Sequence, residues 1–228
     1  MRYLLLLVCL AGMTAINRVY GETVPAILNA SACATPPTID GEIKADEWNS
    51  ATIHRIELPF VRISPAVSEQ RNCELRVMNS ANGLYIAFTV PDTTVDDSLS
   101  PMRLDAAILA TTTDDGLHSD RKLVAADLYR DKYKGPSGQD DLDDAQQDGV
   151  AVMKRSEGFC TFEWALPLNA PDGNDLQVKP GGEFQFNLTY FDGFQLPLTQ
   201  TIMGGLYGPA LDKVASWGTV RLAEDVQD

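Results

Sequence analysis

Short runs of alternating apolar and polar side chains recur along most of the chain, and turn residues separate them. In "CELRVM", residues 73–78, the alternation is typical of a strand with one buried face. "NSANGLYIAFTVPD" follows, with an Asn-Gly turn signal ahead of a run from Leu84 to Val90 that ends at a proline. These two runs predict one β-hairpin.

The remaining runs are similar in length, and each is bounded by Gly, Pro, Asp or Ser. They are "ATIHRIELPF", "DAAILATTT", "KLVAADLY", "GVAVMK", "FCTFEWALPL", "EFQFNLTYF" and "SWGTVRL". "LVAADLYRDKY" is the best helix candidate, and we predict a strand there because its neighbours are strands. About nine or more short strands joined by turns predict an all-β, antiparallel β-sandwich. The segment 131–148 has loop composition, and so long a loop is usually functional or disordered.

The N-terminal residues are typical of a secretory signal. Arg2 precedes an apolar run that is too short to span a bilayer, and small residues follow it. Cleavage after Gly21 is favoured, with Ala15 as the alternative. Lipid attachment at Cys9 is disfavoured because the apolar run ahead of it is very short. We therefore expect a signal peptide at 1–21, a lead-in segment at 22–35, one domain at 36–228, and a secreted or periplasmic protein.

The chain is strongly acidic. Its formal net charge is −14, and loss of Arg2 and Arg18 with the signal brings the mature chain near −16. Such a surface repels the phosphates of nucleic acids and anionic lipids. We expect neither nucleic acid nor membrane insertion after signal removal, which leaves neutral ligands and cations as candidate partners.

Three cysteines remain after cleavage at Gly21, namely Cys33, Cys73 and Cys160. In an oxidising compartment an odd count permits at most one internal bridge and one free thiol. The sequence leaves the three pairings open. A bridge from Cys33 is favoured because it would tie the lead-in segment to the domain, and three buried free thiols are the alternative.

Six motifs in order resemble the family 9 carbohydrate-binding modules. They span Pro36 to Leu222 and read "PPTIDGEIKADEW", "LYIAFTVPD", "LDAAILATTTDDG", "FCTFEWALPL", "KPGGEFQFNLTYFDG" and "SWGTVRL". The resemblance implies a jelly-roll-like β-sandwich. It also implies a turn at Asp40-Gly41 that leads into a short helical segment, with Trp48 and Trp217 as packing residues.

The resemblance implies binding of a neutral glycan or sugar end without catalysis. Aromatic faces stack on sugar C–H surfaces, and planar polar groups bind the hydroxyls. The candidate ligand-binding residues are Arg103, Asp105, Tyr133, Trp164, Phe194, Gln195 and Tyr207. The chain departs from the family pattern in one respect, because sugar-binding members place two tryptophans around the sugar and no clear second one is present here. Core packing is the alternative for Trp164.

Acid-rich segments make calcium a candidate cofactor, since carboxylates are the oxygen ligands that calcium takes. The candidate ligands are Asp92, Asp96 and Asp97, and a second acid run lies in "QDDLDDAQQD". Neither has the spacing of an EF-hand loop, and a solvated acidic face is the alternative.

Two other functional classes are alternatives. Related sandwiches hold a b-type haem, for which the candidate axial ligands are Met78, Met102, Met153, Lys154 and His118. The second alternative is a structural or interaction subunit of an extracytoplasmic complex, which would bind a protein partner. We do not expect an enzyme, because no zinc-protease motif, nucleophile elbow or phosphate-binding glycine loop is present.

Overall fold

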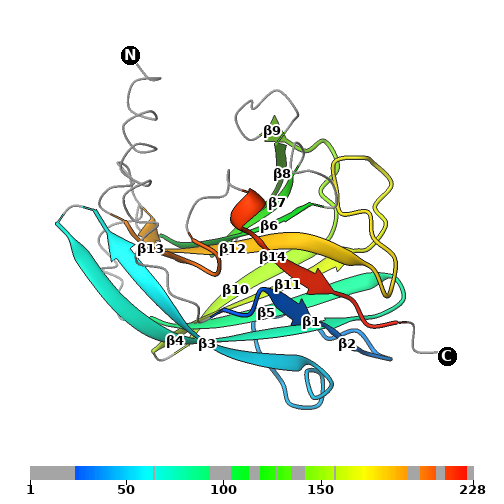
Figure 1. The fold of residues 1–228 in the computed structure, drawn as a ribbon, viewed down its shortest axis with the longest axis horizontal. Helices are drawn as coiled ribbons and strands as arrows, with labels where there is room; N and C mark the ends of the chain where they lie inside the picture. Colours follow the sequence, from blue (N-terminus) through cyan, green and yellow to red (C-terminus); the bar gives the residue numbers. More distant parts are fainter. Residues whose placement is uncertain are drawn as a thin grey trace.

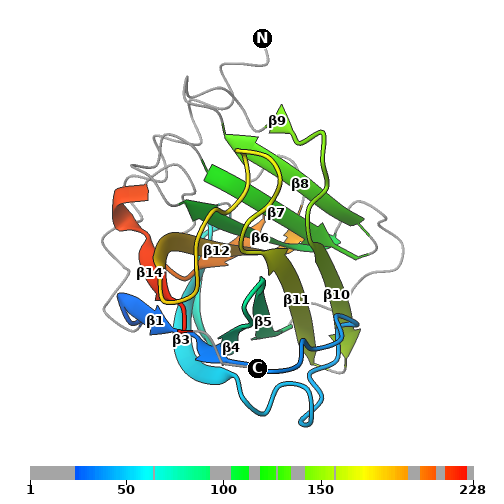
Figure 2. The same cartoon turned by 90° about the vertical axis from the view of Figure 1, so that its right-hand side faces the viewer.

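A computed structural model describes residues 24–63, 65–92, 104–112, 119–126, 128–134, 142–156, 158–194, 201–208 and 214–224. The described residues form two facing layers of strands, as Figures 1 and 2 show, and contain no α-helix. Layer one consists, in spatial order, of β10 (Val150–Ser156), β11 (Phe159–Pro167), β5 (Gly83–Pro91), β4 (Val67–Asn79) and β3 (Thr52–Arg62). Layer two consists of β13 (Ile202–Gly205), β12 (Glu183–Phe194), β6 (Leu104–Thr112), β7 (Ser119–Ala125), β8 (Leu128–Lys134) and β9 (Leu142–Asp143).

The two layers are parts of one continuous sheet that folds over itself. The layers join where β3 pairs with β13, and this pairing consists of only two register pairs, Val61 with Met203 and Phe60 with Gly204. All neighbours along this path are antiparallel. The predicted all-β sandwich is therefore confirmed. Among the described residues, no helix is long and apolar enough to cross a membrane.

The predicted strands are present, with two local differences. The hairpin is confirmed as β4 and β5, which pair from Glu74 with Thr89 to Asn79 with Leu84. "KLVAADLY", predicted as one strand, is divided between β7 and β8, because Ala126 has a φ of 46° and reverses the chain. Segment 131–148, predicted as one loop, is also partly strand, because β8 runs to Lys134 and β9 lies within it.

The lead-in segment predicted at 22–35 is part of the sheet. Strand β1 (Ile27–Asn29) lies parallel to β14 (Gly218–Arg221), which also pairs with β12. Strand β2 (Ser31–Ala32) lies parallel to the end of β4. A short 3-10 helix, η2 (Val214–Ser216), precedes β14. The N-terminal segment therefore contacts both layers.

The main core lies between the layers, where alternate side chains of each strand point inward. Three aromatic rings join the layers across it. Tyr190 of β12 makes edge contacts with Phe60 of β3 and Phe162 of β11, with ring centroids 5.8 and 5.6 Å apart. These contacts stabilise the fold beyond simple area burial. The apolar interior, rather than the short β3–β13 connection, holds the layers together.

A second, smaller core lies on the outer face of layer one. The segment 33–51 covers part of this face and buries Trp48 completely against Met78 and Ala87. Trp48 and Trp217 are both buried, as predicted for packing residues. The short helical segment predicted before Trp48 is a single turn, because only the N–H groups of Glu47 and Trp48 donate to the carbonyl oxygen of Lys44.

Glu163 fixes the position of this covering segment. Its buried carboxylate accepts hydrogen bonds from the backbone N–H groups of Asp40 (3.0 Å) and Gly41 (2.6 Å). Gly41 has a φ of 80°, and a Cβ at this position would lie 2.4 Å from the Cβ of Lys154. The Asp-Gly pair of the first motif and the Glu of the fourth therefore form one structural unit.

The favoured disulfide is not present. Cys33, Cys73 and Cys160 are all free and buried. Cys33 belongs to the outer core, whereas Cys73 and Cys160 belong to the core between the layers. The lead-in segment is tied to the domain by strand pairing and by the outer core, and a bridge from Cys33 is not part of that attachment.

Replacement of Glu163 by Ala is expected to lower the free energy of unfolding by about 2–4 kcal/mol, because two backbone N–H groups lose a buried acceptor. Urea unfolding of the mature protein at pH 7 measures this. Glu183→Ala is the matched control. Its half-exposed carboxylate pairs, among the described residues, with exposed Arg221, so its loss is expected to stay below about 1 kcal/mol. Equal losses in the two variants would contradict the anchoring role of Glu163.

Candidate functional site

Several ionisable side chains gather where β5 and β12 end and β6 begins. Arg155 of β10 pairs through Nε with the Asp92 carboxylate at 2.9 Å, and through Nη2 with Asp105. Asp105 also accepts a hydrogen bond from the backbone N–H of Gly193 at 2.9 Å. We call this group, together with Arg71, Asp192 and Cys160, the carboxylate end.

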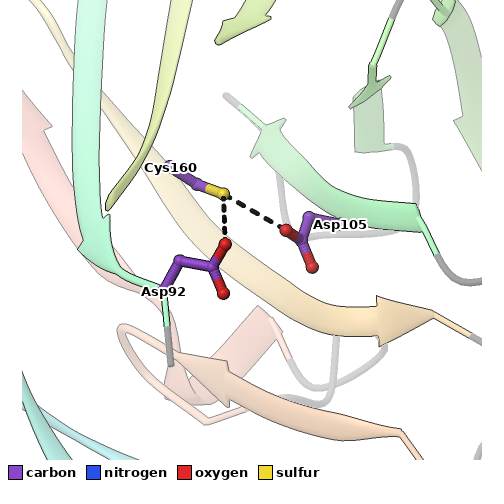
Figure 3. Close-up of side chains that lie close together, drawn as sticks. All are labelled: Asp92, Asp105 and Cys160. Atoms are coloured by element: carbon purple, nitrogen blue, oxygen red, sulfur yellow. Dashed lines mark hydrogen bonds between the residues drawn. The ribbon is translucent and has the colours of Figure 1, made fainter. Parts of the chain in front are cut away.

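The Cys160 thiol lies between two of these acids, as Figure 3 shows. Its Sγ is 3.2 Å from an oxygen of Asp105 and 3.7 Å from an oxygen of Asp92. Burial raises the pKa of this thiol to about 12, and the neighbouring carboxylate of Asp105 acts in the same direction. The thiol is therefore protonated at neutral pH and is a poor nucleophile.

A second ion pair lies between the carboxylate end and the core. The buried guanidinium of Arg71 donates through Nη2 to the Asp192 carboxylate at 2.6 Å and through Nη1 to the Pro91 carbonyl at 3.1 Å. The same guanidinium carbon lies 4.4 Å above the ring of Phe60. Paired, hydrogen-bonded charges of this kind are tolerated in an interior, whereas an unpaired one is not.

The carboxylate end contains donors of the kind that bind metals. One atom each of Asp92, Asp105 and Cys160 lies within 4.8 Å of the others. Arg155, however, already pairs with both carboxylates and compensates their charge. Burial raises the pKa of Asp105 in spite of the hydrogen bond from Gly193. These groups are best described as a compensated ionic network at the ends of β5, β6, β10, β11 and β12.

The predicted site residues are only partly brought together. Asp92 and Asp105 both belong to the carboxylate end. The backbone of Phe194 ends β12 opposite Leu104, one residue before Asp105. Four other predicted site residues lie outside the described residues, namely Arg103, Gln195, Asp96 and Asp97. The calcium site predicted at Asp92, Asp96 and Asp97 stays a prediction.

Trp164 does not contact solvent. It is fully buried in the main core and stacks on Phe162, with ring centroids 5.9 Å apart. The strand register gives the reason, since Trp164 shares the inward face of β11 with Cys160 and Phe162. The structure therefore confirms the alternative interpretation, in which Trp164 is a core residue.

Tyr133 and Tyr207 lie apart from the carboxylate end. Tyr133 is in β8, where it pairs with Asp120 and Leu142, and not in the loop predicted for it. Tyr207 makes an edge contact with Phe186, and its hydroxyl donates to the Pro25 carbonyl at 2.6 Å. A Cβ at Gly218 would overlap the Tyr207 ring, which explains the glycine of the Trp-Gly motif. The structure gives Tyr207 a packing role.

The candidate haem ligands within the described residues do not come together at one place. Met78 belongs to the outer core with Trp48, whereas Met153 packs against the core between the layers. Lys154 is on the outer side of β10 and pairs with Glu42. Met102 and His118 lie outside the described residues. Because Met78 and Met153 point to opposite sides of layer one, they are not a ligand pair for one iron.

A second ionic cluster lies in layer two around Lys122, which is 1% exposed. Its ammonium pairs with Asp120 at 2.9 Å, with Asp131 at 2.5 Å and with Asp175. Burial raises the pKa of Asp120 to about 8 and that of Asp175 to about 7, because attraction to Lys122 offsets it only in part. Burial alone would lower the pKa of Lys122, but its carboxylates raise it, so the ammonium stays charged.

The Lys122 cluster adjoins another group of acids. One carboxylate oxygen each of Asp144, Asp172 and Asp175 lies within 4.8 Å of the others, a spacing suitable for a cation. Asp144 lies in the acid run that the sequence marked as a second calcium candidate. The other two come from the "PDGND" turn after β11, which the sequence analysis did not single out.

The ionic networks were missed by reasoning from sequence because their members are far apart in the chain. Arg71 and Asp192 are 121 residues apart, and Lys122 and Asp175 are 53 apart. One signal was available, since Lys122 begins the apolar run "KLVAADLY" and shares the inward face of that strand with Val124. In a strand with a buried face, such a lysine requires buried partners.

Comparisons with known proteins place the fold. No protein-family profile and no curated protein sequence matches the chain. Among solved structures, a family 9 carbohydrate-binding module from Caldicellulosiruptor kristjanssonii in complex with cellotriose is similar. The TM-score is 0.57 at 15% identity, over 88% of this chain and 95% of that one.

Two further structures are similar in the same way. The module from C. kristjanssonii in complex with glucose has a TM-score of 0.54 at 15% identity, over 89% of this chain and 98% of the other. A candidate carbohydrate-binding protein from Bacteroides uniformis ATCC 8492 has a TM-score of 0.54 at 12% identity, over 86% and 98%. At these identities the likeness establishes the fold, and the resemblance read from the motifs is confirmed at that level.

The Lys122 cluster makes stability depend on pH. The folded-state pKa values of Asp120 and Asp175 exceed those of the unfolded chain, so the folded protein binds more protons between about pH 4 and 8. The free energy of unfolding that this cluster contributes should therefore fall as the pH rises through this window.

The Lys122→Met variant should lower the free energy of unfolding by about 3–5 kcal/mol at pH 8, where buried carboxylates lose their counter-charge, and by less at pH 5.5. Urea unfolding with a chelator present measures both, and equal losses at the two pH values would refute this account.

Proposed function

We propose that this protein is an exported, non-catalytic carbohydrate-binding protein that recognises a neutral glycan. The observation that carries the proposal is the fold, which follows family 9 carbohydrate-binding modules along most of the chain. The two similar structures of such modules are complexes, one with cellotriose and one with glucose. The strongly acidic composition supports a neutral ligand over phosphorylated or sulfated ones, because like charges repel. Export rests on the N-terminal signal pattern alone.

The pairing of buried acids supports a non-catalytic role. Glycoside hydrolysis requires two carboxyl groups that flank the scissile bond, one of them as a proton donor. At the carboxylate end, Asp92 and Asp105 share Arg155 as their counter-ion, and Asp192 is paired with Arg71. In the Lys122 cluster the acids surround one buried ammonium. Within the described residues, neither group presents an acid pair to a substrate.

Native affinity gels that contain neutral polysaccharides test this function directly. We expect retardation of the mature protein by at least one polysaccharide among hydroxyethylcellulose, xylan, galactomannan and glycogen. Incubation with the retarding polysaccharide should release no reducing sugar. Migration unchanged in all four gels would overturn carbohydrate binding, and release of reducing ends above a heat-inactivated control would overturn the non-catalytic assignment.

A further inference from the structure

On the outer face of layer one, one half is covered, and the other half is open as far as the described residues show. The segment 33–51 covers the half that contains Met78 and Ala87. The open half holds a depression of about 500 Å³ across β3, β4, β5 and β11, strands that lie side by side in Figure 2. Six outward side chains line it, namely Arg55, Glu57, Asn72, Glu74, Thr89 and Phe159.

Strand register places these side chains on one face. Glu74 of β4 is opposite Arg55 of β3 on one side and Thr89 of β5 on the other. Glu57 is opposite Asn72 in the neighbouring row, and Phe159 of β11 is opposite Pro91. Their sequence neighbours, such as Ile56, Cys73 and Cys160, point into the core. The depression is therefore built on rigid strands rather than on loops.

The lining combines an aromatic platform with planar polar groups. Phe159 is 45% exposed, and it is the aromatic ring among the large apolar side chains that the described residues expose. On the β3 and β4 side of the same depression, the Arg55 guanidinium lies 3.4 Å from the Glu74 carboxylate, which also accepts a hydrogen bond from Arg76 at 2.6 Å. An exposed ring at one side of a depression and polar donors and acceptors at the other match the C–H faces and hydroxyls of a sugar chain.

The dimensions of the depression favour a chain over a single sugar. Neighbouring strands lie ~4.8 Å apart, so the distance from β11 to β3 is ~14 Å. The strand spacing is close to the repeat of a pyranose unit in an extended β-1,4-linked chain. A chain that lies across the strands therefore meets one outward side chain per sugar unit. The row of outward side chains that contains Thr89 continues across β11 to Lys154 of β10. Lys154 forms an ion pair with Glu42 of the covering segment, and this pair lies at the border of that segment.

A second depression of about 580 Å³ lies between the β4–β5 turn and the segment after β11. Asn82, Asn169, Gln177 and Lys179 line it together with apolar residues, and its lining within the described part of the chain includes no aromatic ring. It therefore has polar groups but no stacking surface. This contrast singles out the Phe159 depression.

We propose that the Phe159 depression binds an internal segment of a neutral, extended β-1,4-linked glycan, about three sugar units long. This proposal rests on the proposed function and assigns it to a surface on the face of layer one. Phe159 stacks on one sugar, and the side chains of Arg55, Glu57, Asn72 and Glu74 bind the hydroxyls of the neighbouring units. Because the depression is an open surface, it accepts the interior of a chain as well as its ends.

The test compares Phe159→Ala with Leu128→Ala, which truncates an exposed apolar side chain on β8 of the other layer. The ligands are hydroxyethylcellulose and xylan in affinity gels, and glucose, cellotriose and borohydride-reduced cellotriose in titration calorimetry. We expect Phe159→Ala to weaken binding about tenfold or more, Phe159→Trp to restore it, and Leu128→Ala to change it less than twofold. Affinity should rise from glucose to cellotriose and be unchanged by reduction of the chain end. Equal urea midpoints of the variants show that folding is intact.

The possible failures are distinguishable. If the Phe159→Ala variant has the same affinity as the unmodified protein, the assignment to this depression is wrong, whereas carbohydrate binding itself still holds. Equal affinity for glucose and cellotriose, or loss of binding on reduction of the chain end, overturns recognition of an internal segment. A protein that no polysaccharide retards loses both the proposed function and the proposed surface.

Discussion

The contact between Glu163 and the turn at Asp40 and Gly41 determines how the outer face of layer one is used. A sheet face with apolar residues such as Met78 and Ala87 must be covered, and the segment 33–51 covers it with Trp48 as the central side chain. The covering segment contains neither a regular helix nor a strand, so its position depends on a few specific bonds. The two hydrogen bonds that the Glu163 carboxylate accepts from backbone N–H groups are among the strongest of these bonds. With the segment fixed there, the other half of the face remains open.

The interior imposes the complementary constraint. The layers are joined by short pairing between β3 and β13, so aromatic packing around Tyr190 and the ionic networks at the layer ends must keep them in register. Arg71 links these two features, because it pairs with Asp192 and also lies over Phe60. Removal of one partner from such a buried pair would leave an uncompensated charge in the interior, which is costly. In both networks at least one pair joins residues that are distant in sequence, Arg71 with Asp192 and Lys122 with Asp175.

Reasoning from the sequence reached the fold because fold information is local and repeated. Alternation along each strand and turn residues between them predict a sandwich, and the Asn-Gly pair predicts the β4–β5 hairpin correctly. The same reasoning placed Tyr133 in a loop and favoured a bridge from Cys33. Both errors concern positions where the outcome depends on partners across the sheet, such as Asp120 for Tyr133 and the outer core for Cys33.

The proposed surface was hidden from the sequence for a related reason. Phe159 begins an apolar run and looks like its neighbours, and only the register with Pro91 shows that it points outward. Arg55, Asn72 and Glu74 are ordinary strand residues until β3 and β4 are placed side by side. A sheet face combines residues that are one strand apart in space and many residues apart in sequence. Loop aromatics, by contrast, attract attention in a sequence whether or not they bind anything.

Mapping of cellotriose on the folded protein by backbone amide chemical shifts tests the central claim most directly. The account predicts that titration perturbs the amides of Asn72, Glu74, Thr89 and Phe159 together, in one saturable process. Amides around Tyr133 should stay unchanged. Saturable perturbation confined to another part of the molecule, with the amides of β4, β5 and β11 unaffected, would contradict it.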